Sequence, residues 1–341
     1  MNIIGGNPLA RIAFLELEGW EKDIIEEKLK GHDLILLKEK LSDEVIDKIK
    51  DVEILSVFIY SRITSEVLDK LPRLKAIVTR STGYDHIDME ACRKKGIHVY
   101  NIPDYGSNTV AEFTFLLIMA LYRKLKEIWE SKWVDPVKFR GHELQGKIIG
   151  VVGTGRIGSH VVKLAHAFGM RILAYDLYPR KELIEKYNVK YVDLETLLRE
   201  SDIITLHLPL TKETYHLIKR DNIKSIKKGA ILINTARGSL VETEAIVEAL
   251  DKGILAGVAL DVVEGEQVLR EEIDIIYGRK QYSLEELKKG LEAHVLMKYP
   301  NAIITPHIAY NTWEAVHRIL DTTIETIKQI IKGQKPCNKV V

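Results

Sequence analysis

The chain has 341 residues, of which 46% are hydrophobic and 29% charged, and its formal net charge is +1. This balance, without long blocks of one sign, argues against a nucleic acid or an acidic membrane as partner, and the length favours two domains. Cys92 and Cys337 lie far apart and outside any metal-ligand spacing, which predicts a reducing compartment and no metal site. The start of the chain carries no basic-then-apolar leader, and the longest uncharged apolar run, residues 113–122, is about half of what a bilayer requires. We therefore expect a cytoplasmic protein.

The first hundred residues alternate between two kinds of segment. Short apolar, β-branched strands are expected at Arg11–Leu17, Leu34–Leu37, Ile54–Tyr60, Ala76–Thr79 and Ile97–Ile102. Charged segments with apolar residues at helical spacing are expected to form helices at Glu21–Lys30, Asp43–Lys50, Ser65–Leu71 and Asp88–Lys95. This alternation predicts a small parallel α/β domain without a glycine-rich phosphate turn.

Residues 107–133 predict one long helix, entered after Pro103 and Gly106. Its first half is apolar on nearly every side, and such a helix requires burial on all sides. We expect it to contact its own domain and also a neighbouring domain or subunit. A homodimer interface is the preferred explanation.

A glycine motif follows the next predicted strand. The apolar segment Ile148–Val152 enters Gly153-Thr154-Gly155-Arg156-Ile157-Gly158, a helix is expected from Ser159 to Phe168, and the strand Arg171–Tyr175 ends on Asp176. In this pattern the first glycine permits a tight turn, the second lets a pyrophosphate approach the backbone, and the third allows close helix–strand packing. The helix N-terminus attracts the phosphates, and an acid about 20 residues on accepts ribose hydroxyls. The segment therefore predicts dinucleotide binding.

The βαβ pattern continues to residue 305. Further strands are expected at Ile203–Leu206, Ala230–Asn234, Gly257–Leu260 and Ala302–Thr305. We expect the charged stretch 267–299 to form an excursion or lid outside the core. The amphipathic helix Trp313–Lys332 is expected to pack back on the first domain. The predicted architecture is α/β, with two Rossmann-like or flavodoxin-like parallel-sheet domains separated by an active-site cleft. Residues 1–105 and 306–341 would form one discontinuous domain, and residues 106–305 the dinucleotide-binding domain.

Polar groups follow three of these strands, at the sheet edge where ligands of parallel α/β proteins bind. Arg237 follows one strand, Asp261 ends the next with Glu264 and Glu266 just beyond, and His307 follows the last. A histidine can deliver a proton to a ketone oxygen, a carboxylate favours its imidazolium form, and a guanidinium can hold a substrate carboxylate. Each could instead be structural: a surface arginine, a packed histidine, a strand-end aspartate. Position alone does not choose between Glu264 and Glu266.

These residues resemble the D-isomer-specific 2-hydroxyacid dehydrogenase family over essentially the whole chain. The resemblance rests on residues 153–158, Asn234-Thr235-Ala236-Arg237-Gly238, residues 260–266 and Thr305-Pro306-His307-Ile308-Ala309. It implies that Glu266 is the partner of the acid/base His307 and that Arg237 binds substrate. It also implies NAD as cofactor, with Asp176 on the adenosine ribose and Asp261 near the nicotinamide carboxamide. Leu177 favours NAD over NADP, although Arg180 lies close.

The resemblance also implies the remaining site residues. Cofactor contacts would come from Gly153, Gly155, Arg156, Ile157, Gly158, Asp176, His207, Pro209, Thr214, Thr235, Ala236, Arg237, Asp261 and His307. Substrate contacts would come from Thr82, Gly83, Tyr105, Arg237, Tyr60 and Tyr310, with the tyrosines equally explicable as packing residues. The expected partners are a small 2-oxo or 2-hydroxy acid and a second copy of the chain, with no metal.

The long gap between Glu266 and His307, and Tyr310 after it, favour the D-lactate dehydrogenase branch: pyruvate and NADH giving D-lactate and NAD. Phe113 and the segment Asp104-Tyr105-Gly106 depart from that branch and leave the side-chain preference open. One alternative is a reductase of glyoxylate, hydroxypyruvate, another 2-oxo acid or a donor such as phosphite within the same family. An alternative of another class is an NAD-sensing binding protein similar to transcriptional corepressors.

Overall fold

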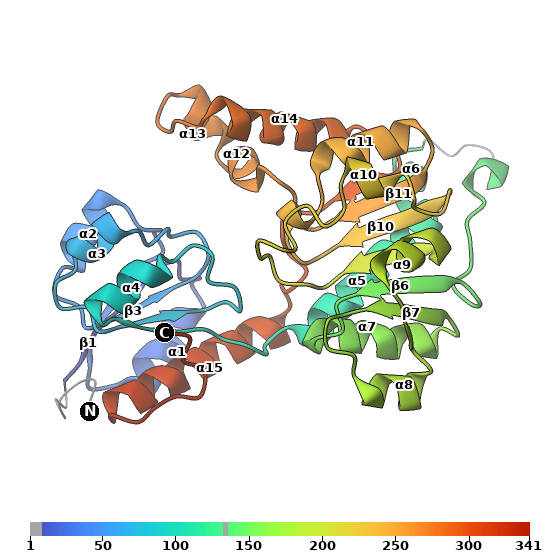
Figure 1. The fold of residues 1–341 in the computed structure, drawn as a ribbon. Coiled ribbons are helices and arrows are strands. Elements are labelled where there is room, and N and C mark those ends of the chain that lie inside the picture. The colour runs from blue at the N-terminus through green and yellow to red at the C-terminus, as the bar shows by residue number, and fades with distance from the viewer. Residues whose placement is uncertain (1–8, 132–135) are drawn as a thin grey trace. The chain divides into compact units, whose positions relative to one another are not determined.

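The computed structural model describes residues 9–131 and 136–341. The chain forms two compact units, Met1–Tyr105 with Thr312–Val341, and Gly106–Asn311 (Figure 1). The return to the first unit thus lies at 311/312, whereas the sequence places it at 305/306. The difference has a physical reason, because Asp261 of the second unit accepts hydrogen bonds from the backbone N–H groups of Ile308 and Ala309.

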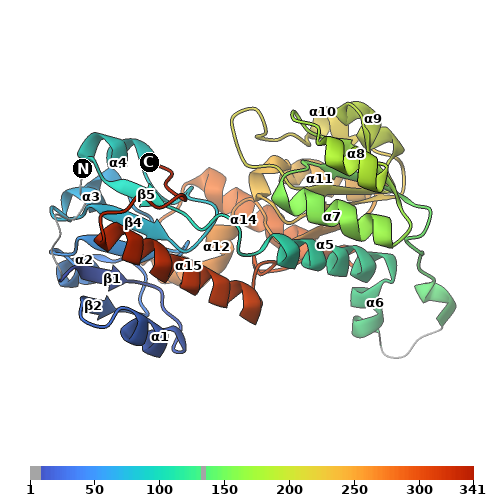
Figure 2. The ribbon, with the colours of Figure 1, turned by 90° about the horizontal axis from the view of Figure 1, so that it is seen from below.

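The first unit is a five-stranded parallel sheet in the order β2-β1-β3-β4-β5. Its strands are β1 (Arg11–Phe14), β2 (Asp33–Leu36), β3 (Ile54–Val57), β4 (Ala76–Thr79) and β5 (His98–Tyr100). Its helices are α1 (Glu21–Lys28), α2 (Asp43–Lys48), α3 (Ser65–Asp69), α4 (Met89–Lys95) and α15 (Trp313–Ile331). α1 and α15 pack on one face and α2, α3 and α4 on the other, and Figure 2 shows α15 running beside β4. The strand order is that of flavodoxin-like sheets.

The second unit is a seven-stranded parallel sheet in the order β12-β11-β10-β9-β6-β7-β8. Its strands are β6 (Ile148–Val152), β7 (Arg171–Tyr175), β8 (Lys190–Tyr191), β9 (Ile203–Leu206), β10 (Ala230–Asn234), β11 (Leu255–Leu260) and β12 (Ala302–Ile304). Its helices are α5 (Ser107–Tyr122), α6 (Leu125–Glu130), α7 (Arg156–Ala167), α8 (Lys181–Tyr187), α9 (Leu194–Glu200), α10 (Arg220–Ile223), α11 (Thr243–Asp251), α12 (Glu266–Arg270), α13 (Glu272–Ile276) and α14 (Leu284–Met297). α5, α7 and α8 cover one face, and α9, α10, α11 and α14 the other. The predicted fold class, with two parallel α/β sheets, is confirmed.

The predicted single helix over 107–133 is wrong. α5 ends at Tyr122, Lys124 adopts a left-handed conformation with φ 51°, and α6 starts at Leu125. The chain returning at His142 donates its N–H to the carbonyl of Tyr122, which satisfies one of the open carbonyls at the end of α5. Trp133, the predicted end of the helix, lies outside the described residues.

The stretch 267–299 also differs from the prediction. α14 packs on α11, α12 and β12, and its Ala293 and Leu296 are part of the buried core of the second unit. Gly290 makes this possible, because a Cβ there would lie 2.5 Å from Val268. α14 is therefore core structure and not a detached excursion. Among residues 9–131 and 136–341 no helix combines the length and the apolarity needed to cross a bilayer.

Candidate functional site

The glycine turn lies where the strand order of the second sheet reverses, between β6 and β9. Gly153 has φ 95°, and a Cβ on it would lie 2.7 Å from the carbonyl oxygen of His207. A Cβ on Gly158 would lie 1.9 Å from the carbonyl oxygen of Gly153, so this glycine permits the close contact between α7 and β6. α7 begins at Arg156, one turn earlier than the sequence predicts.

Gly155 has a different task from the other two glycines. A Cβ placed on it would meet nothing within 4 Å, and it precedes α7 without a side chain that caps the helix. The first N–H groups of a helix lack intrahelical partners and carry partial positive charge. The open space beside Gly155 at the start of α7 therefore fits the diphosphate of a dinucleotide.

Asp176 lies beside this turn. Its Oδ2 accepts hydrogen bonds from the backbone N–H of Thr154 at 2.6 Å and from the Thr154 hydroxyl at 3.0 Å. Its Oδ1 accepts from the N–H of Tyr178 at 2.9 Å. The acid that the sequence assigns to the ribose is thus fixed to the glycine turn.

His307 and Glu266 form a hydrogen-bonded pair, with 3.1 Å between Nδ1 of the imidazole and Oε1 of the carboxylate. Burial raises the pKa of Glu266, but the hydrogen bond and charge of His307 and the charges of Arg270 and Arg237 outweigh it and leave the pKa below its usual value. Arg270, one helical turn later, also pairs with the carboxylate. Both His307 and Arg237 are thereby within electrostatic reach of Glu266.

The loop that carries His307 is clamped by Asp261. The carboxylate, only 1% exposed, accepts from the Thr305 hydroxyl at 2.6 Å and from the N–H groups of Ile308 and Ala309, each at 2.9 Å. Inside this clamp His307 adopts φ 56°, a left-handed conformation that is uncommon for a residue with a Cβ. A contact of Asp261 with the nicotinamide carboxamide stays a prediction, while the hydrogen bonds give Asp261 the task of presenting His307.

Arg237 sits on a turn that Asn234 shapes. Asn234 donates its side-chain amide to the carbonyl of Arg237 at 2.8 Å and accepts the N–H of Ala236 at 3.0 Å. Gly238 follows with no room for a side chain, since a Cβ would lie 2.3 Å from the carbonyl carbon of Val263. Sequence reasoning missed this role of Asn234, although an asparagine at a strand end signals such a turn.

Glu264 belongs to a separate cluster. It is 5% exposed and accepts hydrogen bonds from His216 at 3.0 Å, from Lys289 at 3.1 Å and from the N–H and hydroxyl of Thr243 at 3.2 and 3.1 Å. Burial raises its pKa, but these hydrogen bonds and the charge of Lys289 hold the pKa below its usual value. In the structure Glu266 is the hydrogen-bond partner of His307, whereas Glu264 binds these other groups. The catalytic role of Glu266 stays a prediction.

His207 and Thr214 occupy the loop after β9. The Nε2 atom of His207 lies 2.9 Å from the Thr205 hydroxyl, and burial lowers the pKa of His207 to about 3. Thr214 donates its hydroxyl to the carbonyl of Pro209 at 2.7 Å. Both side chains are therefore part of the loop's own structure, and their contacts with a cofactor stay predictions.

The remaining predicted substrate residues are divided between the units. In the first unit, the loop after β4 is held by the Thr82 hydroxyl on the carbonyl of Ile102 and by the Ser81 hydroxyl on the carbonyl of Gly83. Tyr60 is half exposed, and the carbonyl of Tyr105 accepts from Arg318. Tyr310 belongs to the second unit, in which Arg237 and His307 also lie. The convergence of the first-unit residues on Arg237 stays a prediction.

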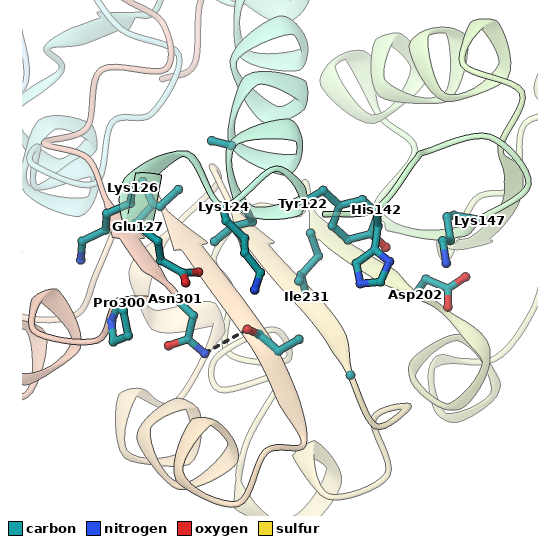
Figure 3. Close-up of a pocket in the computed structure, with 15 residues that line it drawn as sticks. Tyr122, Lys124, Lys126, Glu127, His142, Lys147, Asp202, Ile231, Pro300 and Asn301 are labelled. Atoms are coloured by element: carbon teal, nitrogen blue, oxygen red, sulfur yellow. Dashed lines mark hydrogen bonds between the residues drawn. The ribbon is translucent and has the colours of Figure 1, made fainter. Parts of the chain in front are cut away.

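A pocket of about 190 Å³ lies at the opposite, amino edge of the second sheet (Figure 3). Its lining includes Lys147, Asp202 and Asn301, which lie just before strands, together with residues of α5 and α6 such as Tyr122 and Lys126. Lys126 donates to three backbone carbonyls there, and Asp202 accepts from the N–H of Ile148 and from Lys227. These charges fix the amino edge of the sheet, away from Gly153 and His307.

Comparisons with known proteins identify the family. Residues 115–309 match the sequence profile of the D-isomer specific 2-hydroxyacid dehydrogenase, NAD binding domain. The chain belongs to the D-isomer specific 2-hydroxyacid dehydrogenase family. Both the family and NAD as cofactor were predicted, and both are confirmed. The enzyme is an NAD-dependent oxidoreductase acting on the CH–OH group of 2-hydroxy acids.

Individual relatives of the enzyme carry different names. The glyoxylate reductase of Thermofilum pendens is 39% identical over 303 residues, which cover 86% of this chain and 83% of its own. The structure of D-lactate dehydrogenase from Aquifex aeolicus, complexed with NAD and lactic acid, has a TM-score of 0.86 and 40% identity, covering 97% of this chain and 99% of that one. A pyruvate reductase of Chlamydomonas reinhardtii has a TM-score of 0.85 and 29% identity, covering 98% and 99%.

Proposed function

We propose that the enzyme is a D-lactate dehydrogenase that reduces pyruvate with NADH and a proton to D-lactate and NAD. The observation that carries this proposal is the hydrogen-bonded pair of His307 and Glu266 at 3.1 Å, with Arg237 close enough to lower the pKa of Glu266. An acid/base, its anionic support and a carboxylate-binding cation are the groups that reduction of a 2-oxo acid requires. The likeness to D-lactate dehydrogenase over 97% of the chain supports pyruvate as the substrate.

The pair determines where the proton is held. An ionised carboxylate only accepts, so the hydrogen of the pair sits on Nδ1 of His307 and leaves Nε2 to face the substrate. When bound, NADH supplies the electron pair that reduces the carbonyl carbon. The imidazolium gives its Nε2 proton to the carbonyl oxygen as negative charge develops there. In the reverse direction the neutral Nε2 accepts the proton of the substrate hydroxyl.

Arg237 positions the substrate. Its guanidinium binds the carboxylate of the oxo acid through a two-pronged hydrogen bond and polarises the adjacent carbonyl. The Asn234 turn and the contact of Gly238 with Val263 hold its backbone, so little ordering remains to be done on binding. From the resemblance alone we also propose that Thr82 and Gly83 contribute backbone N–H groups for a substrate carboxylate, and that Tyr60, Tyr105 and Tyr310 contact the substrate side chain.

A second candidate substrate is glyoxylate or hydroxypyruvate. It is favoured by the glyoxylate reductases of Thermofilum pendens and Thermococcus litoralis, which are 39% and 37% identical to this chain. His307, Glu266 and Arg237 would serve this reaction equally well, because they act on the carboxylate and carbonyl that all 2-oxo acids share. The substrates differ only in the side chain beyond the carbonyl.

A panel of 2-oxo acids separates the candidates. We expect kcat/KM with NADH to be highest for pyruvate, and chiral chromatography to identify the product as D-lactate. A preference of about tenfold or more for glyoxylate or hydroxypyruvate would replace the lactate assignment. Tight NADH binding without turnover of any oxo acid would instead indicate an NAD-sensing binding protein.

We also propose that the enzyme is a homodimer. α5 buries one side on α7 and on the sheet, but Leu116 is 50% exposed, and Leu125, Ile128 and Trp129 of the following segment are exposed as well. Leu116, Leu125 and Trp129 border an apolar groove that also includes Ile304 and Ile308. Exposed apolar surface of this kind marks an interaction site. Light scattering should give twice the chain mass, and Leu116→Lys should shift the protein to monomer.

The cytoplasmic location predicted from the sequence is kept as a proposal. Cys92 is buried, Cys337 is exposed, and both are free thiols. Free thiols are ordinary in reducing compartments, where disulfides do not persist. Fractionation of the source cells, with the activity followed, tests this location.

A further inference from the structure

A chain of hydroxyl groups leads from the edge of the second sheet to Asp176. The Tyr191 hydroxyl, on the edge strand β8, donates to the Thr154 hydroxyl at 2.9 Å. The Thr154 hydroxyl donates in turn to Oδ2 of Asp176 at 3.0 Å. The Tyr191 oxygen itself accepts the backbone N–H of Arg180 at 3.1 Å. Each hydroxyl has one hydrogen, so this chain, here called the relay, has a single direction, towards the carboxylate.

The relay completes the fixation of Asp176. A carboxylate offers about four acceptor positions, and protein donors from Thr154 and Tyr178 occupy three of them. The two donors on Oδ2 come from one residue, Thr154, which is 1% exposed and cannot move without the glycine turn. Asp176 is therefore oriented before any dinucleotide binds, with part of Oδ1 left for a ligand hydroxyl.

The relay also contacts a residue with a positive charge, because the Tyr191 hydroxyl accepts the backbone N–H of Arg180. Arg180 donates its guanidinium to the Ser159 hydroxyl at 2.7 Å, and that hydroxyl lies against the carbonyls of Thr154 and Gly155. An arginine held at the glycine turn could attract the 2′-phosphate of NADP. A fixed carboxylate at the same place repels that phosphate, provided that it cannot turn away.

We infer that Tyr191 and Thr154 are positioning residues that set the preference of the enzyme for NADH over NADPH. They do so by holding the Asp176 carboxylate where it accepts a ribose hydroxyl and opposes a 2′-phosphate. The inference rests on the proposed role of Asp176 at the adenosine ribose. It concerns cofactor choice alone and is independent of the identity of the oxo acid.

The test measures dissociation constants for NADH and NADPH by nucleotide fluorescence in the full chain. Thr154→Val keeps the volume but removes the hydroxyl, and we expect NADH to bind about tenfold more weakly. NADPH should bind as tightly as before or more tightly, because the released carboxylate opposes the 2′-phosphate less. Tyr191→Phe should weaken NADH about threefold in the same direction, because it removes a donor one step further away. In steady-state kinetics these variants should raise KM for NADH and change kcat little.

Three further variants make the result decisive. Thr154→Ser restores a hydroxyl and should restore the NADH/NADPH ratio, which a purely steric role of Thr154 would not do. Tyr187→Phe removes a tyrosine hydroxyl in the same unit outside the relay and controls for general effects, since the ring of Tyr187 contacts His166. Asp176→Ala tests the proposed role of Asp176 at the adenosine ribose. Of all the variants, it should bring the dissociation constants for NADH and NADPH closest together.

Two results would overturn the inference. The first concerns the ratio of the dissociation constants for NADPH and NADH. If Asp176→Ala narrows this ratio while Thr154→Val and Tyr191→Phe both leave it within about twofold of the wild type, the inference fails. The second is an unchanged ratio in Asp176→Ala, which removes the ribose role as well. Neither result affects the proposed reaction of His307, so the two proposals fail separately.

Discussion

Two of the histidine–glutamate pairs in the described part of the second unit have glutamates that are two residues apart. Glu266 pairs with His307 at 3.1 Å, and Glu264 pairs with His216 at 3.0 Å. Gly265 separates the two glutamates with φ 73°, and a Cβ there would lie 2.5 Å from the N–H of Gly290, so the turn aims the two carboxylates at different partners. Glu264 is also bound by Lys289 and Thr243, whereas the His307 pair is near Arg237 at the edge where parallel sheets bind ligands. These surroundings are consistent with the proposed division, in which one pair serves chemistry and the other serves structure.

Removing His307 should produce the largest difference between the pairs. His307→Ala should lower kcat for reduction roughly 100- to 10,000-fold, because the proton donor is lost. NADH affinity, measured by fluorescence, should stay close to that of the wild type. His216→Ala is the matched control, and a comparable loss of kcat in that variant would contradict the division of roles.

Neutralising Glu266 should have the next largest effect. Glu266→Gln should lower kcat about 100-fold, because the imidazolium loses its anionic support. An anionic neighbour favours the charged form of its hydrogen-bond partner, so its neutralisation should move the alkaline limb of the pH–rate profile for reduction to lower pH. An unmoved profile would argue against Glu266 as the support of His307.

Replacing Arg237 tests the third member of the site. Arg237→Lys keeps the charge but offers no planar fork, so KM for the oxo acid should rise roughly 10- to 100-fold. Steady-state kinetics with a saturating concentration of NADH measures this change. An unaltered KM would remove Arg237 from the substrate.

Neutralising Glu264 should affect stability more than chemistry. Glu264→Gln leaves Lys289 without its anionic partner, and we expect the free energy of unfolding to fall by about 2 kcal/mol. For a unit of this size the melting temperature should fall by about 5 °C. A loss of kcat similar to that of Glu266→Gln, without a change in melting temperature, would contradict the structural role.

The pH dependence of this stability has a definite sign. The folded-state pKa of Glu264 lies below its ordinary value of 4.5, so its contribution is present above that value and is lost as pH falls through the lower, folded pKa. The difference in melting temperature between the wild type and Glu264→Gln should therefore shrink on acidification below about pH 4.5. Calorimetry at neutral and acidic pH measures it.

Local patterns predicted a large part of the fold. The strands β1, β3, β4, β6, β7, β9 and β10 were expected within a few residues of their observed bounds. Apolar runs and turn residues are short-range signals, and burial of both sheet faces makes parallel strands continuously apolar. The break at Lys124 and the packing of α14 were not predicted, because both depend on residues far away in the chain, His142 in one case and Val268 with the sheet core in the other.

The amino-acid pattern was enough to predict the family, the dinucleotide turn and the candidate residues Arg237, Asp261, Glu264, Glu266 and His307. Which of these side chains meet depends on the fold. Asp261 clamps a loop 44 to 48 residues away, and Glu266 reaches a histidine 41 residues away. The physical reason is that hydrogen bonds and ion pairs act over a few ångströms, while strand order and helix packing set which distant residues come within that range.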